Sequence, residues 1–154
     1  MIKEFILIAF ISTVSVGEKI KTLTGKEMSV EVVGQITSGI NKCKGVNNNL
    51  LLALIMTESS FNSKAYNSKT KDYGLMQISE WHVKRSGLNR DRLINDPEYN
   101  IKVGCEILQW FLKRYPESEA IGRYNGGTGK DVMEWRAVKK YVGRVYFYKK
   151  MLDE

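Results

Sequence analysis

The residue best suited to chemistry in this sequence is Glu58, an acid at the end of the apolar run Leu50–Thr57. If this run is helical, Glu58 shares a face with Leu54 and Leu51, so its carboxyl group points toward side chains that the helix buries. Burial disfavours the charged form and raises the pKa, and a glutamate that stays protonated near neutral pH can act as a general acid. A buried glutamate can equally be paired for structural reasons, and the pattern alone does not separate the two interpretations.

The elements around Glu58 are expected to be helices. Ser29 is a good N-cap for a helix with apolar residues at helical spacing that ends near 43–45. The next helix opens at 47–49 and runs to Glu58 or Ser59. Because it is apolar almost all the way round, we expect it to be the central buried helix.

The remainder of the chain alternates irregular and helical stretches. Residues 62–72 are polar and aperiodic, which predicts a loop or a short irregular hairpin. Asp96 and Pro97 form a strong helix start, and Gly104 within that helix suggests the close approach of another backbone. A short helix after 117 ends in a glycine-rich turn, and a last helix occupies 135–152. The sequence therefore predicts one mostly α-helical domain.

Length and charge narrow the function classes. The chain has 154 residues, 43% of them hydrophobic, and a formal net charge of +7, so an anionic partner is plausible: nucleic acid, a membrane surface or an acidic wall polymer. The basic residues are scattered among acids and form no nucleic-acid motif, which argues against nucleic acid as a partner.

The first residues have the layout of a secretory signal. Lys3 precedes an apolar stretch of 5–14 that is too short to span a bilayer, and small residues flank Val16. We expect a signal peptide at 1–17, a linker at 18–28 and the functional domain at 29–154, hence an exported protein. An uncleaved amphipathic or buried helix is the alternative for the N-terminus.

Two cysteines and one histidine bear on redox state and metals. Cys43 and Cys105 permit one disulfide in an exported protein, and two separately buried thiols are the alternative. With His82 as the sole histidine and no CxxC pair, the spacing indicates no metal site.

Four short motifs follow one another along the chain: Glu58-Ser59, the Gly-Leu-Met-Gln segment 74–77, the Tyr-Asn-Gly segment 124–126 and Tyr141. In this order they resemble the soluble lytic transglycosylase domain of the lysozyme-like superfamily, whose members cut peptidoglycan. The resemblance covers most of 30–150, and is greatest to small exported versions that accompany secretion systems, conjugation machinery or phage. It implies a lysozyme-like (goose-type) helical domain with an irregular loop or small hairpin beside the cleft, peptidoglycan strands as partner, and action as a monomer.

The resemblance also implies a mechanism that uses one carboxyl group and no metal or nucleotide cofactor. The glutamate, here Glu58, protonates the glycosidic oxygen between N-acetylmuramic acid and N-acetylglucosamine, then accepts the proton of the muramyl 6-hydroxyl. That hydroxyl closes on C1 and leaves a 1,6-anhydro end, while the substrate's acetamido group stabilises the cationic intermediate, an exception to the two-carboxylate rule.

Substrate-binding roles are carried over by position. Met76 and Gln77 would line the cleft, Tyr124 and Asn125 would contact sugar or the catalytic carboxyl, and Tyr141 would hold Glu58 by a hydrogen bond. Ser59, Asn67 and Ser68 complete the expected substrate-binding set, the last two because the family often places there a serine that contacts the acetamide. Met76 and Tyr141 can instead be ordinary core residues, and Gly126 and Gly127 can serve only a turn.

Two alternative functions remain open. Asp72 precedes Tyr-Gly much as the second carboxylate of c-type lysozymes does, so a hydrolytic muramidase that uses Asp72 is one alternative. The other is a catalytically silent wall-binding protein. The presence of Glu58 in its motif argues against this alternative.

Overall fold

In the computed structural model, which describes residues 16–154, helices α2 and α3 begin at side-chain caps. The Ser29 side chain accepts a hydrogen bond from the Val32 amide at the start of α2 (Val30–Lys42). Asn47 caps α3 (Asn48–Ser59) in the same way, and every residue of 50–55 in α3 is buried. The expected central helix is therefore confirmed, and Glu58 lies in its last turn.

The second half of the chain contains more helix than the sequence indicated. Its elements are α4 (Glu80–Ser86), α5 (Arg90–Asn95), α6 (Pro97–Leu112), α7 (Glu117–Gly126), the 3₁₀ helix η1 (Val132–Glu134) and α8 (Arg136–Asp153). The start of α6 at Asp96 and Pro97 is as predicted. The short α4 and α5 were not foreseen because each buries only one residue within its bounds, Val83 and Leu93, too few for a visible period.

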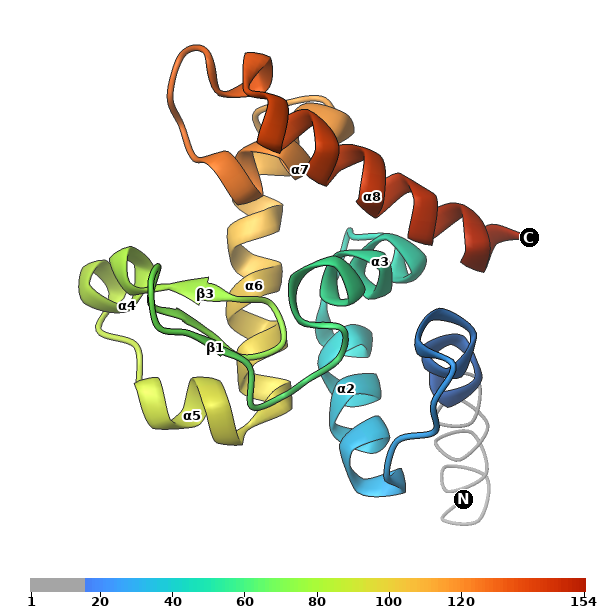
Figure 1. The fold of residues 1–154 in the computed structure, drawn as a ribbon. Coiled ribbons are helices and arrows are strands. Elements are labelled where there is room, and N and C mark those ends of the chain that lie inside the picture. The colour runs from blue at the N-terminus through green and yellow to red at the C-terminus, as the bar shows by residue number, and fades with distance from the viewer. Residues whose placement is uncertain (1–15) are drawn as a thin grey trace.

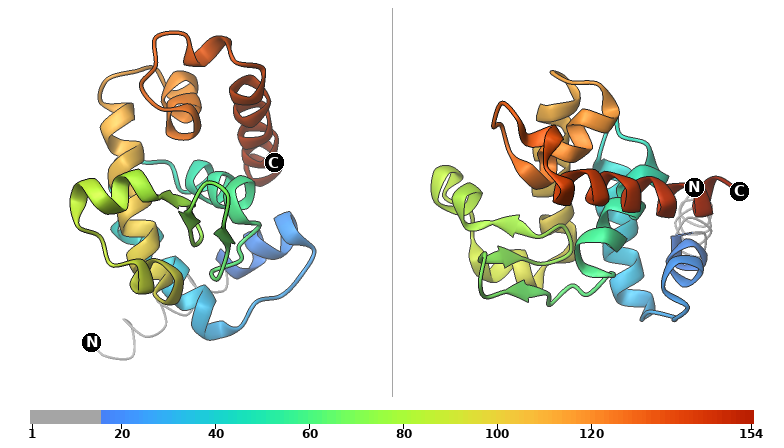
Figure 2. Two further views of the ribbon diagram at one scale, coloured as in Figure 1. Left: turned by 60° about the vertical axis from the view of Figure 1, so that its left-hand side comes forward. Right: turned by 45° about the horizontal axis from the view of Figure 1, so that its top comes forward.

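Helices α2, α5 and α7 pack on α6, which runs through the middle of the molecule (Figure 1). α2 packs on α6, while α8 packs on α3 and α7, so the C-terminal helix covers the end of α3 that carries Glu58. The two further views in Figure 2 show the small sheet and α4 projecting on one side of α6, with α7 and α8 at its far end. The mostly α-helical, lysozyme-like architecture is thus confirmed.

A three-stranded antiparallel sheet occupies the segment expected to be a loop or hairpin. Strand β2 (Asp72–Tyr73) lies between β1 (Tyr66–Asn67) and β3 (Ile78–Ser79), with Asp72 opposite Asn67 on one side and Ser79 on the other. Each strand has only two residues. The sheet packs against α4, α5 and α6 and is too small to form a core layer.

The N-terminal part of the described chain corrects one expectation. Residues 16–24 form a helix, whereas an irregular linker was predicted at 18–28. Val16, Ile20 and Leu23 are buried in the core, and their spacing of four and three residues is the helical stripe that a reading of the segment as polar overlooked. Most of the expected signal peptide at 1–17 lies outside the described residues, so the domain boundaries stay a prediction.

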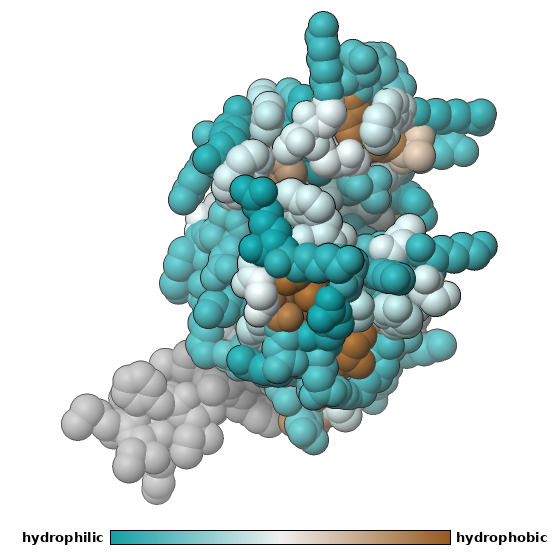
Figure 3. Space-filling view, turned by 90° about the vertical axis from the view of Figure 1, so that its left-hand side faces the viewer, coloured by the Kyte–Doolittle hydropathy of each residue, from teal (hydrophilic) through white to brown (hydrophobic). Residues whose placement is uncertain are grey.

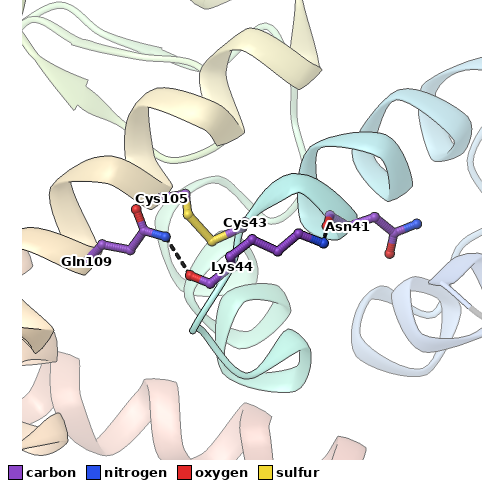
Figure 4. The surroundings of a disulfide bond; sticks show 5 residues. All are labelled: Asn41, Cys43, Lys44, Cys105 and Gln109. Carbon is purple, nitrogen blue, oxygen red and sulfur yellow. Dashed lines mark hydrogen bonds between the residues drawn. A yellow bond between two sulfur atoms is a disulfide. The ribbon is translucent and has the colours of Figure 1, made fainter.

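The two cysteines are joined. Cys43 at the end of α2 and Cys105 in α6 form a disulfide with a Cα–Cα distance of 5.9 Å, as the export prediction permitted (Figure 4). Gln109, one turn further along α6, donates from its side-chain amide to the Lys44 carbonyl (2.5 Å), which fixes the same junction. A loop of 62 residues closed in this way contributes about 4 kcal/mol in the chain-entropy account.

We expected another backbone to approach Gly104, but it is a side chain that lies against this glycine. A Cβ atom placed on Gly104 would lie 2.3 Å from the sulfur of Met76. The segment Gly74–Met76 is thereby seated directly against α6. Among residues 16–154, no helix has both the length and the apolar character needed to cross a membrane.

Candidate active site

Glu58 is held at the mouth of a groove by a hydrogen bond from a distant helix. The Tyr141 hydroxyl, on the buried face of α8, donates to Glu58 Oε1 at 2.5 Å. The pKa of Glu58 is raised to about 7, chiefly by burial of the carboxyl group and to a smaller extent by the negative charge of Asp72. The Tyr141 hydrogen bond and the charge of Arg144 act in the opposite direction and limit this rise. The side chain is therefore partly protonated near neutral pH.

Tyr141 is itself suited to remain a neutral donor. Burial, together with the neighbouring charge and hydrogen bond of Glu58, raises the pKa of the Tyr141 phenol well above its usual range. A phenol that does not ionise can donate to the carboxylate form of Glu58 at any physiological pH. The predicted contact between the two residues is present, and Tyr141 is also part of the core.

The groove beside Glu58 has a volume of about 340 Å³ and brings together residues from the sheet, α3, α6 and the end of α7. Of the residues expected to act in catalysis or substrate binding, five line it: Glu58, Asp72, Gln77, Tyr124 and Asn125. Acid, second carboxylate and amide groups thus share one concave surface, the usual setting for a binding site.

Gln77 is fixed by its own backbone as well as by its side chain. It has a left-handed conformation (φ +49°), unusual for a residue other than glycine, and its side-chain amide donates to the Gly74 carbonyl at 3.0 Å. Such a residue persists only where its surroundings over-determine it, which is common beside functional sites.

Tyr124 supports the groove in a way the sequence did not suggest. Its hydroxyl donates to the Met76 carbonyl at 2.8 Å, so it bonds to neither the Glu58 carboxyl nor an open position. Burial raises the pKa of the Tyr124 phenol well above its usual range, which keeps it a donor. Tyr124 therefore ties α7 to the segment before Gln77 while its ring lines the groove.

Met76 does not line the groove as expected, because its side chain is fully buried against α6. Its backbone is held by Asn100, a fully buried residue of α6 whose side chain accepts from the Met76 amide at 2.8 Å. The same Asn100 side chain donates to the carbonyls of Tyr73 (2.8 Å) and Leu93 (2.9 Å). Asn100 was not identified from the sequence.

Three residues of the expected binding set lie apart from the groove. Asn67 and Ser68 are exposed on the tip of the β1–β2 hairpin, where the Asn67 side chain accepts from the amides of Lys69 and Thr70. The Ser59 hydroxyl donates back to the Ile55 carbonyl at 3.3 Å. None of the three lines the groove, because the hairpin turns its polar tip outward and Ser59 faces its own helix.

The sequence missed much of the groove's opposite wall. This wall consists of residues from α4, α6 and the turn after α7: Trp81, His82, Ile107, Phe111 and Thr128. Trp81 is 60% exposed, and an exposed tryptophan is the kind of signal that could have drawn attention to α4. Burial lowers the pKa of His82, as does the charge of Arg85, so the imidazole is neutral at neutral pH.

The glycine-rich turn after α7 is held by Arg123. This buried guanidinium donates to the Gly129 carbonyl at 3.1 Å and pairs with Glu119 at 2.9 Å. Gly126 is required for packing, because a Cβ atom there would lie 2.2 Å from Val132. Gly127, with φ +84°, begins the turn after α7 as expected, whereas Gly126 is still the last residue of that helix.

The groove therefore offers proton-transfer chemistry based on one carboxyl group. Glu58 has a pKa near 7 and a fixed phenolic partner, which suits a group that must donate a proton and then accept one. Within the part of the chain that the structure describes, no cluster of three or more histidine, cysteine or acidic side chains could hold a metal ion.

Comparison with known proteins gives a consistent result. The family model described as the transglycosylase SLT domain matches residues 37–146. Protein IpgF of Shigella flexneri is 36% identical over 104 residues, which cover 63% of this chain and 67% of that protein. Invasion protein IagB of Salmonella typhimurium is 33% identical over 112 residues, 68% of this chain and 69% of its own length. Membrane-bound lytic murein transglycosylase C of Pectobacterium atrosepticum is 33% identical over 102 residues, 55% of this chain and 28% of that protein.

Proposed function

Because the chain belongs to the family of transglycosylase SLT domains, we propose that it is a peptidoglycan lytic transglycosylase that cleaves the β-1,4 bond between N-acetylmuramic acid and N-acetylglucosamine. The observation that carries the proposal is Glu58: a carboxyl group with a pKa of about 7, lining a groove and held by Tyr141. The products would carry 1,6-anhydro-muramyl ends.

The reaction divides into two proton transfers at the same carboxyl group. Protonated Glu58 gives its proton to the glycosidic oxygen as the bond from that oxygen to C1 of the muramyl residue breaks. Glu58, now a carboxylate, accepts the proton of the muramyl 6-hydroxyl while the oxygen of that hydroxyl bonds to C1. No water is consumed. The Tyr141 hydrogen bond favours the carboxylate form and so eases the change from acid to base.

The first test is the variant Glu58→Gln. Glutamine keeps the shape and can still accept the Tyr141 hydrogen bond, but it can neither donate nor accept the catalytic proton. We expect cleavage of purified peptidoglycan to fall by about 10³-fold or more, in line with loss of an essential acid and base, while the circular dichroism spectrum stays unchanged. Retained cleavage by this variant would overturn the assignment of Glu58 and would not distinguish among reaction types.

Mass spectrometry of the products separates the proposal from hydrolysis. Anhydro ends are lighter than reducing ends by one water, and the proposal requires that most new muramyl ends be anhydro. One observation favours the second candidate, a hydrolytic muramidase: Asp72 lines the same groove as Glu58 and its charge acts on that carboxyl. If only reducing ends form, Asp72 serves as the second carboxylate and the transglycosylase proposal fails.

The site of action follows from the substrate. We propose that the enzyme is exported, works as a monomer on peptidoglycan in the periplasm, and opens the wall locally for a larger secretion apparatus. The relative IagB carries the name invasion protein, which favours such a role. Fractionation of cells that express the full chain is the measurement: the protein should be recovered in the periplasmic fraction, and recovery in the cytoplasm would contradict export.

A further inference from the structure

A second cavity of about 310 Å³ lies between α4 and α6, next to the groove of Glu58. We call it the α4/α6 pocket. Its walls are mostly apolar and come from Trp81, Leu88, Val103, Ile107 and Trp110. It lies on the side of the molecule that bears α4, where patches of apolar surface are exposed among hydrophilic side chains (Figure 3).

The α4/α6 pocket is continuous with the groove. Five residues line both cavities: Trp81, His82, Ile107, Phe111 and Thr128. A ligand that extends from Glu58 along α4 therefore enters the pocket without leaving the surface. The two cavities together can accept a branched or elongated substrate that neither could hold alone.

Two exposed tryptophans stand at this pocket, each with an arginine against its ring. Trp81 is 60% exposed and Trp110 is 44% exposed. The guanidinium carbon of Arg85 lies 5.1 Å from the centre of the Trp81 ring, and that of Arg114 lies 3.9 Å from the centre of the Trp110 ring. Because arginines lie against these rings, the pocket differs from a plain aromatic platform for neutral sugars.

The pocket also presents one charge of each sign. Arg85 on α4 and Glu106 on α6 both line it. Among residues 16–154 neither side chain forms an ion pair or hydrogen bond with another residue, whereas most other charged groups of α4–α6 are paired, for example Glu80 with Arg90. A cation that contacts only an aromatic ring and an anion without an ion pair, both beside an apolar wall, suit a ligand that has a carboxylate, an amine and short aliphatic segments.

We propose that the α4/α6 pocket binds the stem peptide carried by a muramyl residue of the substrate. This inference rests on the proposed function. The stem is a short peptide joined to the lactyl group of the sugar, and it supplies carboxylates and an amine close to the glycan. Arg85 would pair with a stem carboxylate, Glu106 with a stem ammonium group, and the rings of Trp81 and Trp110 would cover the aliphatic parts.

The direct test uses the inactive Glu58→Gln protein and two probes, a disaccharide that carries a tetrapeptide stem and the same disaccharide without the peptide. By isothermal titration calorimetry we expect the peptide-bearing probe to bind about tenfold more tightly, the equivalent of one charge-assisted contact. Adding Arg85→Gln should remove this difference. The matched control is Arg136→Gln, an exposed arginine that lines neither cavity, and it should leave the tenfold ratio in place. Equal affinity for the two probes would overturn the proposal.

A kinetic test with the active enzyme separates failure of the pocket from failure of the proposed function. Each protein is given peptidoglycan with intact stems and glycan strands stripped of stems by an amidase, and the ratio of the two kcat/KM values is compared. Trp110→Ala should lower this ratio about tenfold, and Trp135→Ala, at an exposed tryptophan outside the pocket, should not. If the wild-type enzyme cleaves both substrates equally well, the pocket assignment is wrong. If it cleaves neither, the proposed function is wrong.

Discussion

The two sides of the groove differ in how their polar groups are held. On the helical side, Glu58 of α3 is bonded by Tyr141 of α8, a residue 83 positions away in the sequence and buried in the core. On the sheet side, Asp72 lines the groove and the tip of the β1–β2 hairpin turns away from it. The polar residues of this hairpin bond to near neighbours: Asn67 accepts from Lys69, and Thr70 donates to Asp72. The first arrangement depends on the whole fold, whereas the second depends only on a turn.

This difference indicates which side is suited to chemistry and which to adaptable contacts. A group that transfers protons must keep its position and its desolvated surroundings, which a long-range contact inside a core provides. An exposed hairpin with local bonds can change without disturbing that core. The sheet side is nevertheless fixed where it leaves β2, because Asn100 binds the backbone at both Tyr73 and Met76.

The largest effect should come from this fixed point. Asn100→Ala leaves the Met76 amide and two carbonyls without their buried partner, so we expect the free energy of unfolding to fall by about 3 kcal/mol in urea denaturation. Asn67→Ala removes an asparagine whose hydrogen-bond partners are exposed, and should change the free energy of unfolding by less than about 0.5 kcal/mol. Similar losses in both variants would show that the contrast between buried and local bonding is wrong.

A second prediction concerns the cost of burying the Glu58 carboxyl. Its folded pKa of about 7 lies above the usual 4.5, so the folded state binds more protons than the unfolded state between these values, and stability falls as the pH rises through that window. Glu58→Gln should avoid this cost: the variant should match the wild type near pH 4 and be more stable by about 2 kcal/mol at pH 8, allowing for partial exposure.

Urea denaturation at the two pH values measures this difference. The control is Glu134→Gln, which removes a negative charge from an exposed residue whose ion pair with Lys139 is also exposed. This control variant should show no comparable gain in the free energy of unfolding at pH 8. An equal gain in both variants would mean that net charge, and not burial of Glu58, sets the pH dependence.

Much of the fold could be predicted because its strongest elements carry local signals. The caps at Ser29, Asn47 and Asp96 fix three helix starts, and the apolar run of 50–55 identifies the central helix. The helix at 16–24 was missed because its stripe of three buried residues lies in a segment of mixed polarity next to the expected signal. α4 and α5 were missed because two short turns leave no period to detect.

The candidate site was predictable only where chemistry and position coincide in one residue. Glu58 is an acid on an otherwise apolar helix face, so its burial could be predicted from the sequence. Asn100 binds the carbonyl of Tyr73, 27 positions away, and no local pattern encodes such a contact. Arg123 binds the carbonyl of Gly129, which comes within reach only because of the conformation of the glycine-rich turn. The position of Met76 depended on a side-chain contact with Gly104, and the sequence showed only that something must come close.

The contrast between the two sides is sharpest at Tyr141, where the expected effect is smaller but more specific. Tyr141→Phe removes the hydroxyl that positions Glu58 and favours its carboxylate form. We expect kcat on peptidoglycan at pH 7 to fall about tenfold, the equivalent of one hydrogen bond. Because that bond lowers the pKa of Glu58, its loss should also move the alkaline limb of the activity profile to higher pH.

Tyr146→Phe is the matched control, since the Tyr146 hydroxyl is also on α8 but donates to Glu117 at the surface. A purely structural role for Tyr141 would lower activity without moving the limb, and that outcome would mean that α8 supports Glu58 by packing alone.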